Sequence, residues 1–261
     1  EDVMNGGTLE FEMMDTPALS AFNSFPVSEI KSEGISVPLI EGSRVFNGQS
    51  SVAIKSTSKD TKIFYTTDGT EPGERSMAYT APLTIDASST VRAIAIGSNG
   101  EKSLAAEARF YKRPNDWNVT ITSKYSTQYT GGGDGGLIDG IRGTVNFASG
   151  EWQGYQAQNF EAVIDMQRET VINKVGGSFL QVASSWIWMP ERIEFEVSND
   201  GREFTKITEI KTDLPTREMK PTIREFLKDI APVTARYVRV KAFNFGKIPS
   251  WHPGAGGDPW I

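Results

Sequence analysis

The segment RIEFEVSNDGREFTKITEI, residues 192–210, carries the clearest structural signal in this chain of 261 residues. In its first half, isoleucine, phenylalanine and valine alternate with glutamate, which is the pattern of a β-strand with one buried face. The Asn-Asp-Gly triplet at 199–201 then favours a tight turn, because these residues tolerate positive φ. The segment therefore predicts an antiparallel hairpin, with Ile193 and Phe195 facing a core.

The same two-residue period recurs along the chain, whereas stretches with a helical period are scarce. We therefore predict an all-β protein. Besides the hairpin, the predicted strands are 50–56, 62–67, 90–97, 104–111, 160–165 and 236–242. The strand at 90–97 is apolar on both faces, which is typical of a strand covered on both sides. Residues 216–230 are interrupted by Pro221 and are predicted to form a loop with a short strand.

Turn-forming and charged residues divide the chain into three parts. Residues 1–33 are predicted to be a connector or the end of a preceding domain, with one strand at 9–14. Residues 34–112 have the length and turn spacing of a small antiparallel sandwich. The segment KRPND, 112–116, is the predicted linker, and residues 113–261 form a larger β domain.

The composition excludes several classes of function. The chain has 27 basic and 33 acidic residues, a net charge of -6 and no basic block, so we expect neither nucleic acid nor an anionic membrane surface as a partner. It contains no cysteine, which removes disulfides, thiolate metal sites and cysteine nucleophiles. No apolar run approaches the ~20 residues of a membrane helix. Because the chain begins with glutamate, we expect a processed chain or an excised fragment.

The stretch FYTTDGTEPGERSMAYTAPLTI (64–85), followed by VRAIAIGSNGEKS (91–103), resembles the chitobiase/β-hexosaminidase C-terminal domain. The resemblance covers most of residues 34–112. It implies an immunoglobulin-like sandwich of the kind that accompanies bacterial glycoside hydrolases.

A second resemblance spans nearly all of the remaining chain. Its segments are GLIDGIRGTVNFASGEWQGY (136–155), FLQVASSWIWMP (179–190), EFEVSNDGREF (194–204), ARYVRVKAFNFG (235–246) and SWHPGAGGDPWI (250–261). These resemble the F5/8 type C, or discoidin-like, domain, the galactose-binding-like fold of carbohydrate-binding module family 32. The resemblance implies an eight-stranded jelly-roll sandwich. It also places Trp152 under the sheet as a core residue and leaves Tyr155 open.

The segment NGGTLEFEMMDTP (5–17) resembles the C-terminal strand of bacterial family 92 α-mannosidases, and a β-hexosaminidase parent is the alternative. Together the resemblances imply a non-catalytic accessory region of an exported glycoside hydrolase, periplasmic, at the cell surface or secreted. The expected partners are a glycan and the catalytic domain of the parent enzyme. The alternative function is a structural spacer that braces the catalytic domain.

Aromatic residues near two loops are the candidates for carbohydrate binding. A pyranose packs its apolar face on an aromatic ring, while its hydroxyls need polar partners at the rim. Trp186 and Trp188 are two residues apart, so both project to one side of an extended segment, with Gln181 as a rim residue. Trp251 and His252 form a second candidate pair. The alternatives are core positions for the tryptophans and a locally hydrogen-bonded loop histidine.

No catalytic residue is predicted. His252 is the only histidine, and no serine, cysteine or aspartate motif accompanies it as a triad would require. A glycosidase needs two carboxylates across the scissile bond. The chain has four Asp-Gly pairs, and turn chemistry explains each of them better; they begin at 68, 134, 139 and 200.

A calcium site is implied by the F5/8-like resemblance, because such modules hold a structural Ca²⁺ at the corresponding loop. The matching ligands are the side chains of Asp139 and Thr144 and the carbonyls of Leu137 and Arg142. Oxygen donors of this kind suit Ca²⁺. The family also supplies a glutamate after the last strand, whereas this chain stops at Ile261, so we expect the site to be incomplete. The alternative for Asp139 is a simple turn.

Overall fold

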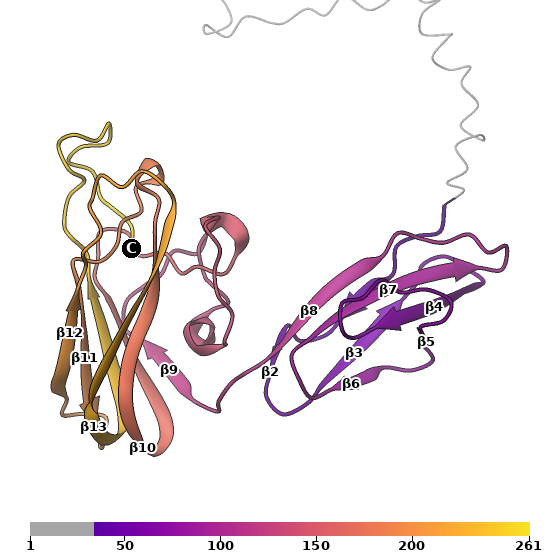
Figure 1. Cartoon of the computed structure of the whole chain (residues 1–261), viewed down its shortest axis with the longest axis horizontal. Coiled ribbons are helices and arrows are strands. Elements are labelled where there is room, and N and C mark those ends of the chain that lie inside the picture. Colours follow the sequence, from indigo (N-terminus) through magenta and orange to yellow (C-terminus); the bar gives the residue numbers. More distant parts are fainter. Residues whose placement is uncertain (1–33) are drawn as a thin grey trace, which may run out of the picture.

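The computed structural model describes residues 34–261 (Figure 1). Within them β-strands dominate and the helices are short 3₁₀ turns, which confirms the predicted all-β class. None of the helices in this part of the chain is long and apolar enough to cross a membrane. The strand predicted at 9–14 and the α-mannosidase resemblance at 5–17 lie outside the described residues.

Residues 34–112 form two sheets around a shared core. Their strands are β1 (Leu39–Glu41), β2 (Val45–Phe46), β3 (Ser50–Lys55), β4 (Thr61–Thr66), β5 (Met77–Ala78), β6 (Leu83–Ile85), β7 (Ser89–Gly97) and β8 (Ala106–Lys112). The smaller sheet has the order β1-β3-β6 and the larger one β2-β8-β7-β4-β5. Val52 and Ile54 of the smaller sheet share the core with Val91 and Phe110 of the larger sheet.

β7 is the central strand of this first unit, and both of its faces are buried, as its sequence predicts. Val91 and Ala93 point into the shared core, while Ile94 and Ile96 on the opposite face are also buried. A strand covered on both sides cannot alternate apolar and polar residues. This explains why residues 90–97 are apolar almost throughout.

Residues 113–261 contain a third sheet, which is antiparallel and has the order β12-β11-β13-β10-β9. Its strands are β9 (Asn118–Ile121), β10 (Phe160–Gln181), β11 (Arg192–Ser198), β12 (Thr205–Lys211) and β13 (Thr222–Phe243); the short helices are η3 (Asp134–Ile138), η4 (Phe147–Ser149) and η5 (Ala183–Ser185). β11 and β12 are the predicted hairpin. Ile193 and Phe195 are 1% exposed, which confirms that they face the core.

The prediction of a loop with a short strand over 216–230 is right for the loop at 216–221 but wrong for the strand, because β13 runs without interruption from Thr222 to Phe243. The pairing partner decides this: residues 222–229 pair with the second half of β10, which the sequence pattern did not extend beyond 165. Pro221 falls directly before the strand, where its missing N–H costs no ladder hydrogen bond.

The β10–β13 pair folds over on itself and thereby makes both layers of the second sandwich (Figure 1). Register shifts interrupt the pairing between Asp165 and Thr170, where Gln167 takes a positive φ of 65°. Such bulges bend a strand pair sharply. Ala162 before the bend and Val175 after it lie in the same core cluster.

The aromatic residue buried beneath this sandwich is Tyr155 rather than Trp152. Tyr155 belongs to the core cluster, and its backbone pairs with Ile261 in both directions, at 2.8 and 2.9 Å. Trp152 is only half-buried, and its Nε1 donates to the carbonyl of Thr144 at 2.7 Å. The prediction that Trp152 is a core residue is therefore wrong, because Trp152 packs against the loop at Gly143 and Thr144 and is not part of the core cluster.

A short connection joins the two units. β8 ends at Lys112 and β9 begins at Asn118, so the segment predicted as a linker lies between them. Arg113 Nη2 donates to the carbonyl of Trp117 at 2.7 Å, and Arg44 of the first unit pairs with Glu151 of the second at 3.0 Å. The connection is thus held by hydrogen bonds at more than one point.

The turn between β11 and β12 makes fold stability depend on pH. Asp200 Oδ1 accepts hydrogen bonds from the amides of Arg202 and Glu203 and from the hydroxyl of Ser198. These bonds lower the pKa of Asp200 from 3.8 to about 2, the amide of Arg202 contributing most. A folded-state pKa below the unfolded value stabilises the fold at higher pH, and this contribution is lost as the pH falls toward about 2.

We expect Asp200→Asn to lower the free energy of unfolding at neutral pH and to flatten its decline as the pH falls from 3.8 toward about 2. Urea unfolding over a pH series measures both effects. Asp229→Asn is the control, since the Asp229 side chain is 83% exposed. Identical pH profiles for Asp200→Asn and the unmodified chain would contradict the prediction.

Candidate functional site

Three loops of the second unit lie together, and we call them the loop surface. They are residues 182–188, which follow β10, residues 212–221, which precede β13, and residues 244–258, which follow β13. Trp188 Nε1 donates to the carbonyl of Thr216 at 3.0 Å, which joins the first loop to the second. The rings of Trp188 and His252 lie 5.3 Å apart, which joins the first loop to the third. The third loop is drawn in yellow at the top of the second unit in Figure 1.

Trp188 and Gln181 do not face solvent, and the prediction that they contact a sugar is wrong. Each is 1% exposed. Gln181 Nε2 donates to the carbonyls of Pro215 and Glu218, at 3.0 and 3.2 Å. Buried polar groups must find partners, and here the partners are the backbone of the loop 215–218. These two side chains therefore anchor that loop instead of binding ligand.

The prediction that Trp186 and Trp188 project to the same side also fails. Trp186 follows the helix η5 in the left-handed conformation, with φ 64° and ψ 23°. The two-residue period holds only for continuous extended backbone, so this residue breaks it. Trp188 enters a small core with Ala183 and Ile248, whereas Trp186 remains 39% exposed.

Glycines of the third loop hold the Trp186 indole in place. A Cβ on Gly254 would approach Cε2 and Cζ2 of the indole to 2.7 Å, and a Cβ on Gly257 would approach Cζ3 to 3.4 Å. The loop backbone therefore packs closely against the ring only because side chains are absent there. The part of the ring that the loop leaves uncovered is open to solvent.

His252 is a structural residue of the third loop. It is 6% exposed, its Nδ1 accepts from the amide of Gly254 at 3.0 Å, and its ring lies edge-on between Trp188 and Trp251. The prediction of a direct sugar contact is therefore not supported, because the imidazole is buried. The alternative, a loop histidine satisfied by a local hydrogen bond, describes it correctly.

Trp251 and Arg217 form the remaining part of the loop surface. Trp251 is partly exposed, and the guanidinium carbon of Arg217 lies 5.4 Å from the centre of its ring. This distance is within the range of a cation–π contact. Sequence reasoning missed Arg217 because no local pattern links the second loop to the third. The loop surface thus presents Trp186, Trp251 and Arg217.

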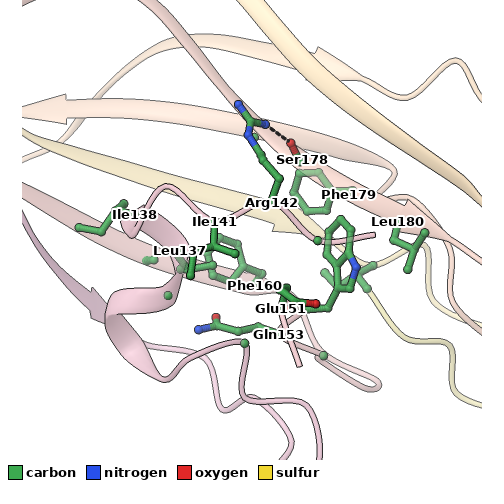
Figure 2. A pocket seen from close by; sticks show the side chains of 18 of the residues that line it. Leu137, Ile138, Ile141, Arg142, Glu151, Gln153, Phe160, Ser178, Phe179 and Leu180 are labelled. Atoms are coloured by element: carbon green, nitrogen blue, oxygen red, sulfur yellow. Dashed lines mark hydrogen bonds between the residues drawn. The ribbon is translucent and has the colours of Figure 1, made fainter. Parts of the chain in front are cut away.

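A separate cavity of about 590 Å³ lies between the layers of the second sandwich and the segment 128–153 (Figure 2). Its walls are mainly apolar, including Ile141, Phe160 and Phe179. Most polar groups there are used internally: at one edge Arg142 donates to the Ser178 hydroxyl at 2.8 Å and pairs with Glu225.

Two further polar side chains of the cavity bear on what it can bind. Gln153 donates to the carbonyl of Gly133 and accepts from the Tyr155 hydroxyl. Glu151 Oε2 is buried without a partner. Of these two side chains, only Glu151 keeps a polar atom that no protein group binds.

Asp139 is the best placed of the predicted calcium ligands. Its side chain is buried, Oδ1 accepts from the amide of Ile141 at 2.7 Å, and Oδ2 faces the glycine turn at Gly132 and Gly136. Burial raises the pKa of Asp139, while the Ile141 amide and the positive charge of Arg44 act in the opposite direction. A bound cation would favour the ionised form of such a carboxylate.

The other predicted ligands fit less well. The carbonyl of Thr144 accepts from Trp152, and its hydroxyl accepts from the amide of Asn146 at 3.2 Å. Leu137 and Arg142 are predicted to contribute carbonyl oxygens rather than side chains, and this stays a prediction. Across residues 34–261, no three histidine, aspartate or glutamate side chains gather around one point. A calcium ion would therefore depend on one carboxylate and backbone oxygens.

Two family models match the chain. The model described as chitobiase/beta-hexosaminidase C-terminal domain matches residues 41–107, and the F5/8 type C domain model matches residues 119–258. Because the second match covers more than half of the chain, the chain belongs to the F5/8 type C family. Two of the three predicted resemblances, to the chitobiase-type domain and to the F5/8 type C domain, are confirmed, whereas the α-mannosidase resemblance stays a prediction.

Solved structures similar to this chain include the module CpGH89CBM32-5 from Clostridium perfringens, in complex with GalNAc-β-1,3-galactose. It shares 18% identity over 55% of this chain and 89% of that chain, with a TM-score of 0.36. The C-terminal domain of a chitobiase from Bacteroides fragilis shares 18% identity over 56% and 89%, with a TM-score of 0.34. Chitosan-binding module 1 from Paenibacillus sp. IK-5 shares 13% over 56% and 90%, with a TM-score of 0.34. No curated protein matches the chain.

We expect Trp188→Phe to lower the free energy of unfolding by about 1–3 kcal/mol, because it removes the hydrogen bond to the carbonyl of Thr216 and leaves part of the buried indole site unfilled. Thr216→Ala is the matched control, since the hydrogen bond uses the backbone and survives that change. Urea unfolding measures both variants. Equal stability of the two would show that the indole N–H does not anchor the loop.

Proposed function

We propose that this chain is a non-catalytic carbohydrate-binding region of a glycoside hydrolase, and that its F5/8 type C domain binds glycan at the loop surface. Membership of that family supports the proposal. The chitobiase-type match supports a glycoside hydrolase as the parent. A family 92 α-mannosidase or a β-hexosaminidase, exported from a bacterium, is the parent that the sequence favours.

The exposed ring of Trp186 is the observation that carries this proposal. It is the one aromatic side chain classed as exposed among residues 34–261. The exposed part of the ring is available to a ligand, and a carbohydrate can pack its apolar face on such a ring. Its packing against Gly254 and Gly257 fixes its orientation in advance. A fixed flat ring suits the apolar face of a pyranose.

The binding should be weak and the benefit should come from tethering. A shallow site buries few ligand atoms and desolvates hydroxyls, which places the dissociation constant on the order of 0.1–1 mM. Holding a catalytic domain close to its glycan raises the effective substrate concentration without any new contact. The carbohydrate-binding domain would in this way direct the parent enzyme to its substrate.

A bracing role is the second candidate, and one contact favours it. Arg44 of the first sandwich reaches Glu151 of the second at 3.0 Å, and the Glu151 side chain is only 15% exposed. The Ser149 hydroxyl and the Arg44 guanidinium hold the pKa of Glu151 below its usual range, against the effect of burial. A pair of this kind would orient the two sandwiches as a spacer.

We expect Trp186→Ala to weaken glycan binding about tenfold or more, since losing roughly 1.5 kcal/mol of ring burial changes the dissociation constant by that factor. Screening on a glycan array identifies the ligand, and calorimetry measures the constants. Leu104→Ala is the control, because Leu104 is an exposed apolar residue of the first sandwich. If neither Trp186→Ala nor Trp251→Ala alters any signal, the loop surface is not the site.

We also propose that Ca²⁺ binds Asp139 together with carbonyls of the segment 137–144, as a structural ion that stabilises the loop. Added Ca²⁺ should then raise the melting temperature and a chelator should lower it, because a ligand that binds only the folded state stabilises it. Asp139→Asn should abolish the response, whereas Asp134→Asn, in the same turn, should retain it. A melting temperature indifferent to Ca²⁺ and chelator would refute the site.

A further inference from the structure

We propose that Arg217 makes the loop surface selective for acidic glycans, by pairing with the carboxylate of a uronic acid whose ring lies on the tryptophan face. This inference rests on the proposed function, because it assigns a charge requirement to the same surface. It goes beyond the stacking role of the tryptophans, which would accept neutral and acidic sugars alike.

Hydrogen bonds from two buried side chains fix the backbone on either side of Arg217. Trp188 Nε1 donates to the carbonyl of Thr216, directly before Arg217, and Gln181 Nε2 donates to the carbonyl of Glu218, directly after it. Both donors are 1% exposed. The turn is closed by the amide of Glu218, which donates to the carbonyl of Pro215 at 3.0 Å. Because the turn is already ordered, binding a ligand at Arg217 does not have to order its backbone.

The position of the guanidinium is set by a ring of the binding surface. Its central carbon lies 5.4 Å from the centre of the Trp251 ring. Contact with an aromatic face orients a guanidinium without using its N–H donors. The donors therefore remain available to a ligand on the same surface.

Arg217 has no acidic partner among the described residues, although acidic side chains occur on the same loops. Asp213 pairs with Arg224 at 3.0 Å, and Asp258 pairs with Lys247. Glu218 Oε1 accepts from the amide of Lys220 at 2.9 Å. In a chain with a net charge of -6, the guanidinium beside the partly exposed Trp251 is thus not neutralised by these neighbours.

A carboxylate is the ligand group that matches these features best. The planar guanidinium presents paired N–H donors that meet both oxygens of a carboxylate, and such charge-assisted bonds are about twice as strong as neutral ones. A hydroxyl occupies only one donor. The loop surface therefore offers a ring for the sugar and a cation for its C6 carboxylate.

The test compares each uronic acid oligosaccharide with its own methyl ester, which keeps the ring and removes the charge. Galacturonate, glucuronate and mannuronate oligomers, and sulfated neutral oligomers as a separate arm, are titrated into the full chain by calorimetry. We expect at least one acid to bind about tenfold more tightly than its ester, and this preference to shrink as salt is added.

Arg217→Gln should lower the affinity for the acid to about that for the ester, so that the preference disappears, and Arg217→Lys should retain part of it. Arg224→Gln is the matched control, because Arg224 already has Asp213 as its partner. Equal binding of acid and ester by the unmodified chain, a preference that survives Arg217→Gln, or a preference confined to the sulfated arm would overturn the inference.

The failure of this inference and the failure of the proposed function give different results. If neutral or esterified glycans bind as well as the acids, and Trp186→Ala abolishes this binding, the carbohydrate-binding function stands and the acid selectivity is wrong. Absence of binding to every neutral and acidic oligosaccharide would overturn both.

Discussion

The pairing of β10 with β13, folded over at its central bulge, is the constraint on which the second sandwich depends. Gln181 at the end of β10 pairs with Thr222 at the start of β13, so the loops that adjoin these two residues must lie together. The opposite end of the pair joins Phe160 to Ala242. Because the pair bends near Asp165, both ends return to the same side of the domain, where Trp188 meets Phe245 with ring centres 5.4 Å apart.

This geometry separates the side chains that build the loop surface from those that can bind at it. The side chains of Gln181, Trp188 and His252 are buried and form hydrogen bonds with backbone groups of the loops. Breaking one of these hydrogen bonds would leave a buried polar group without a partner, which costs more free energy than the bond itself contributes. The bonds therefore hold the loops in place. Trp186 and Trp251 stay accessible only because these buried neighbours support the backbone beneath them.

The same contrast distinguishes the loop surface from the internal cavity. In the cavity, Arg142 pairs with Glu225 and Gln153 is bonded on both sides of its amide. On the loop surface, Arg217 contacts a ring rather than a carboxylate. A ligand can be recognised only by polar groups that do not already have partners within the protein. Arg217 is such a group, whereas Arg142 and Gln153 are not.

Sequence by itself determined the all-β class, both families, most strands and the hairpin at 192–210, because alternation and turn chemistry act between residues close in the chain. It also identified two of the three loops of the loop surface, 182–188 and 244–258. Only the tertiary structure decided that β13 begins at Thr222, that Trp186 is exposed while Trp188 is buried, and that Arg217 lies beside Trp251. The exposure of Trp186 depends on its left-handed backbone, and the other two depend on contacts between segments far apart in the chain. Neither kind of feature produces a periodic pattern in the sequence.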